Sequence, residues 1–206
     1  MDSKNHWEKI YSTKTSDSVS WFQQHADKSL SIIKKLNLQK NASILDVGGG
    51  ASTLVDDLLE EGFTDVSVLD LSAAALATAK KRLGGLSASV KWIEADITAL
   101  DLQKHSIDVW HDRAVFHFLT SKSDRDKYIK AVLNIVRPGG FVIVATFAED
   151  GPEQCSGLAV QRYSASELHS EFGNPFQLLG HEKEEHKTPS GNSQSFVYCY
   201  CRKNHS

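Results

Sequence analysis

The pattern of apolar and polar positions changes near residue 40. Residues 1–40 are mostly polar with scattered aromatic residues, and the apolar positions from Leu30 to Leu38 predict an amphipathic helix that ends near Asn37. From residue 43 onward, short apolar runs alternate with amphipathic stretches. We therefore expect a helical cap or lid over residues 1–40, followed by one domain over residues 41–206.

Five apolar runs predict the strands of a buried sheet, over residues 43–47, 66–70, 90–94, 107–110 and 141–147. Helices are predicted over residues 52–61, 124–136 and 166–172, and from a cap at Ser72 to Leu83. Strands that alternate with helices indicate a doubly wound, parallel α/β sheet. A turn is expected at residues 137–140. Two further strands are predicted over residues 176–182 and 195–202, joined by a turn-rich loop at residues 188–192. We therefore expect a mostly parallel, seven-stranded sheet that ends in an antiparallel hairpin.

Composition and charge are those of an ordinary soluble domain. Of the 206 residues, 40% are hydrophobic and 24% are charged, with a net charge of −3. The charge gives no argument for a nucleic-acid partner, and no apolar stretch approaches the length that spans a bilayer. Three cysteines without regular spacing do not indicate a disulfide framework. We expect a cytoplasmic protein, monomeric or weakly dimeric, with no nucleic-acid or membrane partner.

A run of glycines lies between the first predicted strand and the helix that follows it. Gly48, Gly49 and Gly50 allow the backbone to approach a ligand closely, and the following helix N-terminus offers N–H groups. By itself, such a loop indicates either a nucleotide-like ligand or a structural turn. The loop lacks the third glycine of a dinucleotide-binding motif, which argues against an NAD(P)-dependent oxidoreductase.

Carboxylates lie at or just beyond the ends of four successive predicted strands. They are Asp46, Asp70, Asp96 and Asp112. Open α/β sheets bind ligands at this edge, and a carboxylate such as Asp70 accepts hydrogen bonds from both hydroxyls of a ribose. Asp46 and Asp112 suit an ammonium group, and Asp96 suits an adenine amino group. Any one of these acids is explained as a cap of a helix or turn, but four in succession indicate one ligand site.

These segments resemble the motifs of class I S-adenosylmethionine-dependent methyltransferases. The matching segments are Ile44–Ser52, Val68–Ser72, Trp92–Ile97, Trp110–Ala114 and Val136–Gly140. The resemblance covers residues 40–148 and implies a Rossmann-like methyltransferase fold with S-adenosyl-L-methionine as cofactor. It implies cofactor contacts from Asp46, Gly48, Gly49, Gly50, Asp70, Leu71, Asp96, Ile97, Asp112 and Trp21.

Two weaker resemblances concern the methyl acceptor. Asp112–Ala114 is similar to a motif of thiopurine methyltransferases and of some protein-lysine methyltransferases. The segments His6–Tyr11 and Ser20–Phe22 resemble the N-terminal part of thiol, halide and thiopurine methyltransferases, which folds over the cofactor. Plain packing of these aromatic residues on a core is the alternative interpretation.

The predicted acceptor site is small and partly apolar. Asp112 and His111 are the candidate bases, because an amine or hydroxyl acceptor must lose a proton. The predicted pocket residues are Arg113, His117, Trp7, Tyr11 and Cys155. His111 and His117 lack the spacing of a metal-binding pair, so no metal site is expected.

The sequence thus predicts methyl transfer to a small molecule, with a thiol or a heteroaromatic ring as the favoured acceptor. A single protein side chain is the alternative acceptor, as in a protein-lysine methyltransferase. A catalytically idle module that binds the cofactor and a partner protein is the third possibility.

Overall fold

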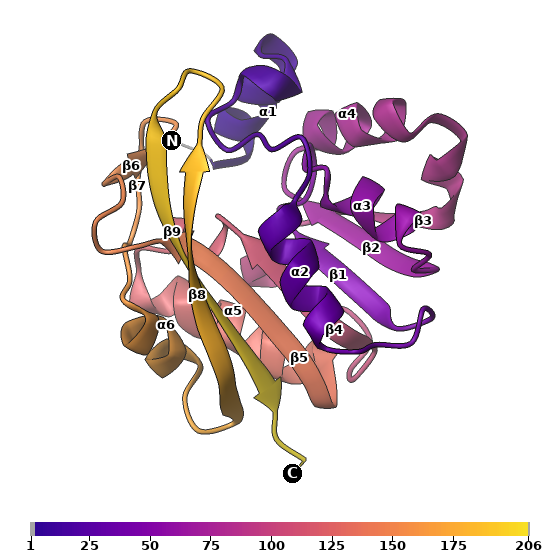
Figure 1. Ribbon diagram of the computed structural model, residues 1–206, viewed down its shortest axis with the longest axis vertical. Helices are drawn as coiled ribbons and strands as arrows, with labels where there is room; N and C mark the ends of the chain where they lie inside the picture. Colours follow the sequence, from indigo (N-terminus) through magenta and orange to yellow (C-terminus); the bar gives the residue numbers. More distant parts are fainter. Residues whose placement is uncertain (1–2, 206) are drawn as a thin grey trace. The chain divides into compact units, whose positions relative to one another are not determined.

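A computed structural model describes residues 3–205 of the chain (Figure 1). Its strands are β1 (Ser43–Val47), β2 (Asp65–Asp70), β3 (Val90–Glu94), β4 (Ile107–Arg113), β5 (Val136–Phe147), β6 (Gln154–Cys155), β7 (Leu158–Ala159), β8 (Phe176–Lys187) and β9 (Ser193–Lys203). Its α-helices are α1 (Ser3–Thr13), α2 (Asp27–Lys35), α3 (Leu54–Glu60), α4 (Ala73–Leu83), α5 (Lys122–Ile135) and α6 (Ala165–Phe172). The predicted strands and helices from residue 43 onward are all present.

Seven of the strands form one mixed sheet in the order β3-β2-β1-β4-β5-β9-β8. The pairs β1–β2, β2–β3 and β4–β5 are parallel, and β9 is antiparallel to both β5 and β8. This order confirms the predicted α/β sheet with its terminal antiparallel hairpin. Among the residues that the structure describes, no helix is long and apolar enough to cross a membrane.

The chain divides into two compact units. The first unit runs through Asp96 and includes Thr188–Asn192, and the second comprises Ile97–Lys187 and the chain from Ser193. The predicted boundary at residue 40 stays a prediction, and its segment begins with two residues outside the described part of the chain.

The first unit is built on β1, β2 and β3. Every residue of β1 is buried, as expected for a strand that is covered on both faces. Helix α4 packs on β2 and β3, α2 packs on α3, and α1 lies beside α4 (Figure 1). The Ser72 hydroxyl accepts a hydrogen bond from the Ala75 N–H at 3.1 Å, so it caps α4 as predicted, and the helix ends before Gly84.

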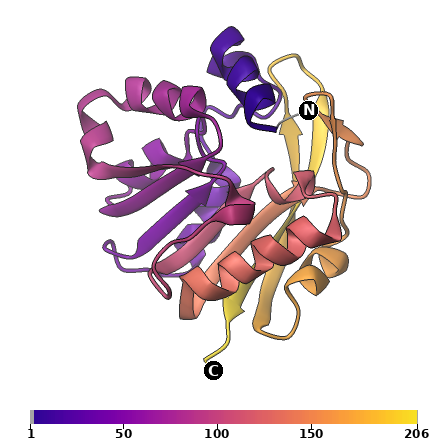
Figure 2. The ribbon, with the colours of Figure 1, turned by 180° about the vertical axis from the view of Figure 1, so that it is seen from behind.

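The second unit contains β4, β5, β8 and β9, with α5 and α6 packed beside each other (Figure 2). Two boundaries differ from the predictions. The predicted turn at residues 137–140 lies within β5, which already pairs with β4 at Val136 and shifts its register before Phe141. Strand β8 continues to Lys187 rather than ending at residue 182, because it is an edge strand whose exposed positions tolerate charged residues.

Candidate cofactor and active site

The glycine loop of the first unit is tied to the end of β2. The N–H groups of Gly48 and Gly49 donate to the Leu69 carbonyl at 2.7 and 3.2 Å. The Gly50 N–H donates to Asp70 Oδ2 at 3.0 Å. These three N–H groups therefore position the loop within the protein.

Two of the glycines are required by the close approach of buried carboxylates. A Cβ atom on Gly49 would lie 2.1 Å from Asp46 Oδ2, and one on Gly50 would lie 2.6 Å from Asp70 Oδ2. Asp46 and Asp70 are only 2% and 7% exposed. The loop and the two predicted cofactor acids thus form one compact surface, where any side chain on the loop would displace a carboxylate.

Asp70 has the properties of a hydroxyl-binding carboxylate. Its two oxygens accept hydrogen bonds from the N–H groups of Ser72 at 2.8 Å and Gly50 at 3.0 Å. Burial raises the pKa of Asp70 to about 6, against the opposing effect of those backbone hydrogen bonds. Each oxygen of an ionised carboxylate has a second lone pair, so Asp70 retains the capacity to accept from a ribose diol.

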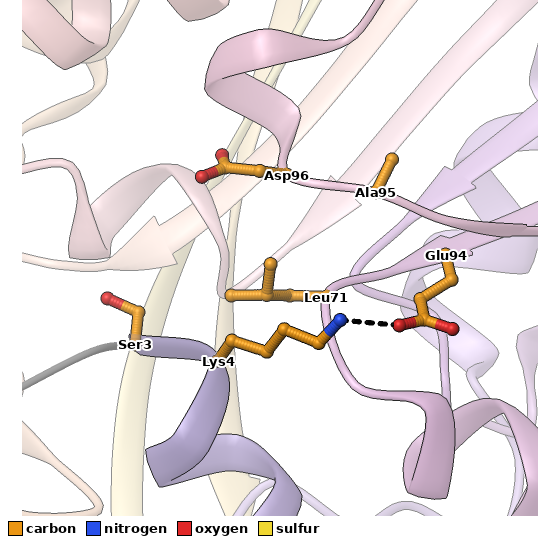
Figure 3. Close-up of a pocket in the computed structure, with 6 residues that line it drawn as sticks. All are labelled: Ser3, Lys4, Leu71, Glu94, Ala95 and Asp96. Carbon is orange, nitrogen blue, oxygen red and sulfur yellow. Dashed lines mark hydrogen bonds and ion pairs between the residues drawn. The ribbon is translucent and has the colours of Figure 1, made fainter.

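A cavity of about 350 Å³ opens at the ends of β2 and β3 (Figure 3). Its lining residues are Ser3, Lys4, Leu71, Glu94, Ala95 and Asp96. Leu71 gives the cavity an apolar surface, whereas the exposed Asp96 supplies a hydrogen-bond acceptor. An adenine ring needs this combination of an apolar contact for its face and an acceptor for its amino group. The cavity and the Asp70 carboxylate fit the nucleoside part of the predicted cofactor.

The N-terminal helix is attached to this part of the first unit by two polar contacts. The Glu8 carboxylate accepts hydrogen bonds from the N–H groups of Ala73 at 2.5 Å and Ala74 at 3.2 Å. Lys4 and Glu94, which both line the cavity, form an ion pair in which Lys4 Nζ lies 2.6 Å from Glu94 Oε1. A carboxylate at the start of α4 satisfies free N–H groups and interacts favourably with the helix dipole. Sequence reasoning did not find these contacts, because the two partners of each are distant along the chain.

The predicted aromatic residues of the N-terminal segment form one cluster. The Trp7 ring lies 5.7 Å from that of Trp21 and 6.2 Å from that of Tyr11, and the Tyr11 and Trp21 rings are 6.1 Å apart. All three side chains are partly exposed. The first unit therefore contains three of the four predicted cofactor acids, Asp46, Asp70 and Asp96, together with an accessible apolar surface made by α1 and the segment that follows it.

Asp112, in the second unit, is fully engaged by hydrogen bonds. It lies inside β4 rather than after the strand, and its side chain is 0% exposed. Its oxygens accept from the Val115 N–H at 2.9 Å, the Phe116 N–H at 3.1 Å and the Tyr128 hydroxyl at 2.7 Å. Burial raises its pKa to about 6. These contacts favour a role in holding the loop after β4 over a role as a base.

His111 and Arg113 neighbour Asp112 on β4 and therefore point to the opposite face of the strand. Arg113 donates to the Tyr198 hydroxyl at 3.0 Å and to Glu184 at 3.2 Å, and its guanidinium lies 4.1 Å from the centre of the Phe196 ring. Arg113 is thus held inside the second unit. His111 is 2% exposed and stays the predicted base.

His117 and Cys155 are buried, uncharged groups. His117 Nδ1 accepts from the Phe147 N–H at 3.4 Å, which assigns the ring proton to Nε2. Burial lowers the pKa of His117 to about 3, so the ring is neutral at pH 7. Within residues 3–205, His117 Nε2 has no hydrogen-bond partner. Burial raises the pKa of the Cys155 thiol to about 11, so the thiol is protonated at pH 7. Ile97, a predicted cofactor contact, is also buried.

Comparison with known proteins identifies the domain. Residues 44–140 match the model of a methyltransferase domain. Human EEF1A lysine methyltransferase 2 is 23% identical over 94% of this chain and 83% of its own length.

Two solved structures share the fold over 98% of this chain. One comes from a study of the conversion of a disulfide bond into a thioacetal group during echinomycin biosynthesis. Its TM-score is 0.80 at 15% sequence identity, and the match covers 92% of its chain. The other, Burkholderia thailandensis 1,6-didemethyltoxoflavin-N1-methyltransferase with bound 1,6-didemethyltoxoflavin and S-adenosylhomocysteine, has a TM-score of 0.68 at 17% identity and is 84% covered. With the glycine loop, the strand-end acids and the strand order, the family match identifies residues 44–140 as a class I S-adenosylmethionine-dependent methyltransferase domain.

Proposed function

We propose that this methyltransferase acts on a small molecule, with a thiol or a heteroaromatic nitrogen as the favoured acceptor. The observation that carries the proposal is the attachment of α1 to α4 through Glu8. That contact holds the aromatic cluster of Trp7, Tyr11 and Trp21 in the same unit as the cofactor acids. A partly apolar surface of this kind suits a small, flat or soft acceptor better than a charged peptide.

The cofactor contacts follow from the same unit. Asp70 accepts hydrogen bonds from the ribose hydroxyls, Leu71 contacts the adenine ring and Asp96 accepts from the adenine amino group. Asp46, next to the glycine loop, neutralises the ammonium group of the methionine part. S-adenosyl-L-methionine supplies the sulfonium methyl group, and the protein supplies orientation and exclusion of water.

The ionisable groups of the second unit favour an acceptor that needs no strong base. Asp112 is occupied by three donors, and His117 is neutral with its acceptor nitrogen already bonded. A thiolate attacks the methyl carbon directly, whereas a heteroaromatic nitrogen uses its lone pair; in both cases the bond to the cofactor sulfur breaks and its electron pair stays on that sulfur. The two structural neighbours support this acceptor class, because one concerns chemistry at a disulfide and the other binds a heteroaromatic compound.

A protein lysine is the second candidate acceptor. It is supported by the match to EEF1A lysine methyltransferase 2, which extends over 94% of this chain. A lysine amine must lose its proton before it attacks, and His111 is the predicted base for that step. The binding of the cofactor by the first unit would be the same.

The test is a methyl-transfer screen with purified enzyme and cofactor that carries a labelled methyl group. Separate reactions receive a panel of thiols, a panel of nitrogen heterocycles, a cellular protein fraction and total RNA. We expect label in a thiol or heterocycle and a loss of that label in the Asp70→Ala variant. Label confined to lysine in one protein would replace the proposal with the second candidate. Label in RNA would reject both.

A further inference from the structure

Three metal-binding side chains meet in the second unit, away from β4. Cys199 and Cys201 lie on one face of β9, and His169 lies in the last turn of α6. Their sulfur and nitrogen ligand atoms are all within 4.8 Å of one another. Both cysteines are 2% exposed, whereas His169 is half-buried. The cluster is therefore accessible to an ion from the helix side and shielded on the sheet side.

The distances within the cluster match the edges of a tetrahedral site. Cys199 Sγ and Cys201 Sγ are 3.6 Å apart, and Cys201 Sγ lies 3.4 Å from His169 Nδ1. Zinc bonds of about 2.3 Å to sulfur and about 2.0 Å to nitrogen place two sulfurs about 3.8 Å apart, and sulfur about 3.5 Å from nitrogen. Two of the three ligand–ligand distances thus already fit one zinc ion, and the third pair, Cys199 and His169, has its ligand atoms within 4.8 Å of each other.

The protein holds these ligands on two well-defined elements. Helix α6 begins with a capping box, in which the Ser164 and Glu167 side chains each bond the other residue's backbone N–H. Strand β9 is paired on both sides, with Cys199 opposite Val144 of β5 and His181 of β8. Preorganised ligands lose little conformational entropy when a metal binds, which favours a tight site.

We propose that His169, Cys199 and Cys201 bind one Zn²⁺ ion that links α6 to β9. Two thiolates and one imidazole are the ligand types that select zinc over magnesium or calcium. On binding, each thiol releases its proton to solvent, and the neutral histidine binds through the lone pair of Nδ1 while its proton sits on Nε2. A water molecule completes the tetrahedron at the fourth position.

The sequence alone did not indicate this site. The three cysteines have no regular spacing along the chain, and no metal site is expected from the histidine spacing. His169 precedes Cys201 by 32 residues, so only the docking of α6 on β9 brings the imidazole to the two thiols.

The experiment is a zinc titration of the full-length chain after reduction and removal of metal with a chelator. We expect one zinc per chain, a rise in melting temperature with added zinc, and cobalt(II) absorption bands of tetrahedral thiolate coordination. We expect zinc affinity to fall by at least about 100-fold in each of three variants: His169→Ala, Cys199→Ser and Cys201→Ser. Losing a residue that only hydrogen-bonds a metal ligand costs up to about 100-fold, so losing a ligand itself should cost at least as much. His169→Cys should retain tight binding.

Cys155→Ser is the matched control, because Cys155 is another buried free cysteine and lies outside the cluster. It should bind zinc as the unaltered chain does. His169→Ala carries the test if a cysteine variant fails to fold, since His169 is half-buried at the end of a capped helix. Unchanged zinc affinity in His169→Ala, no stoichiometric zinc in the unaltered chain, or a Cys199–Cys201 disulfide in freshly purified protein would each overturn the proposal. S-adenosylhomocysteine affinity should be the same in the His169, Cys199 and Cys201 variants as in the unaltered chain, so the result is independent of the proposed acceptor.

Discussion

The two units treat their buried polar groups in different ways. In the first unit, the carboxylates of Asp46 and Asp70 lie close against the glycine loop. Asp70 accepts hydrogen bonds from two backbone N–H groups and still has lone pairs that can accept from a ligand. In the second unit, buried groups pair with one another: Asp112 with Tyr128, and Arg113 with Glu184 and Tyr198. The comparison indicates that Asp70 of the first unit retains hydrogen-bonding capacity for a ligand, whereas the buried polar groups of the second unit hold its own strands and loops together.

The largest effect is expected where the loop meets Asp70. Gly50→Val places a branched side chain where even a Cβ would lie 2.5 Å from the Ala75 Cβ and 2.6 Å from Asp70 Oδ2. Either the loop or the carboxylate must move, so calorimetry should show S-adenosylhomocysteine affinity reduced by about 3 kcal/mol. Gly85→Ala is the control, because no atom lies within 4 Å of a Cβ at that glycine. Equal affinity in Gly50→Val would remove the loop from the site.

The next effect concerns the Asp70 carboxylate itself. Asp70→Ala removes the acceptor of the ribose hydroxyls and frees the Gly50 and Ser72 N–H groups, so affinity for S-adenosylhomocysteine should fall by about 1–3 kcal/mol. Asp65→Ala, at the other end of β2, removes a surface ion pair with Lys91 and should leave the affinity unchanged. Similar losses in both variants would point to general destabilisation of β2 instead.

A smaller effect is expected from pH. Burial raises the pKa of Asp70 to about 6, so the carboxylate gains a proton as the pH falls through that value. The proton occupies one acceptor position, and cofactor affinity should decline progressively below pH 6 while staying level above pH 7. The pKa of Asp112 is also about 6, so a variant is needed that removes only the titration of Asp70. Asp70→Asn should bind the cofactor more weakly than the unaltered chain, and its affinity should not decline further below pH 6. A decline that persists in Asp70→Asn would assign the pH dependence to another group.

The smallest effect belongs to the N-terminal helix. Glu8→Ala removes the acceptor of the Ala73 and Ala74 N–H groups and should lower the free energy of unfolding by about 0.5–1 kcal/mol. It should also speed release of the cofactor in stopped-flow measurements, since α1 keeps only the Lys4–Glu94 ion pair of its two polar contacts. Lys9→Ala, at an exposed neighbouring position, serves as the control. No change in release rate would mean that α1 packs on α4 without acting as a lid.

The same contrast explains which features could be predicted from the sequence. Asp46, the glycine loop and Asp70 lie close together along a strand–loop–helix–strand pattern whose spacing fixes their positions at the strand ends. The Arg113–Tyr198 contact joins residues 85 positions apart, and the Lys4–Glu94 contact joins residues 90 apart. Such pairs depend on how separate elements dock, which periodicity does not encode. The end of β8 was predicted too early for a different reason. Its last residues are mostly charged, and such a segment is read as a loop unless the strand is known to lie at the edge of the sheet.

The most direct test of the central claim is a crystal structure of the chain with bound S-adenosylhomocysteine. We predict that both ribose hydroxyls donate to the Asp70 carboxylate, that the adenine ring lies against Leu71, and that its amino group faces Asp96. An adenine ring bound elsewhere, or ribose hydroxyls bonded to a different side chain with Asp70 still engaged only by Gly50 and Ser72, would contradict the account.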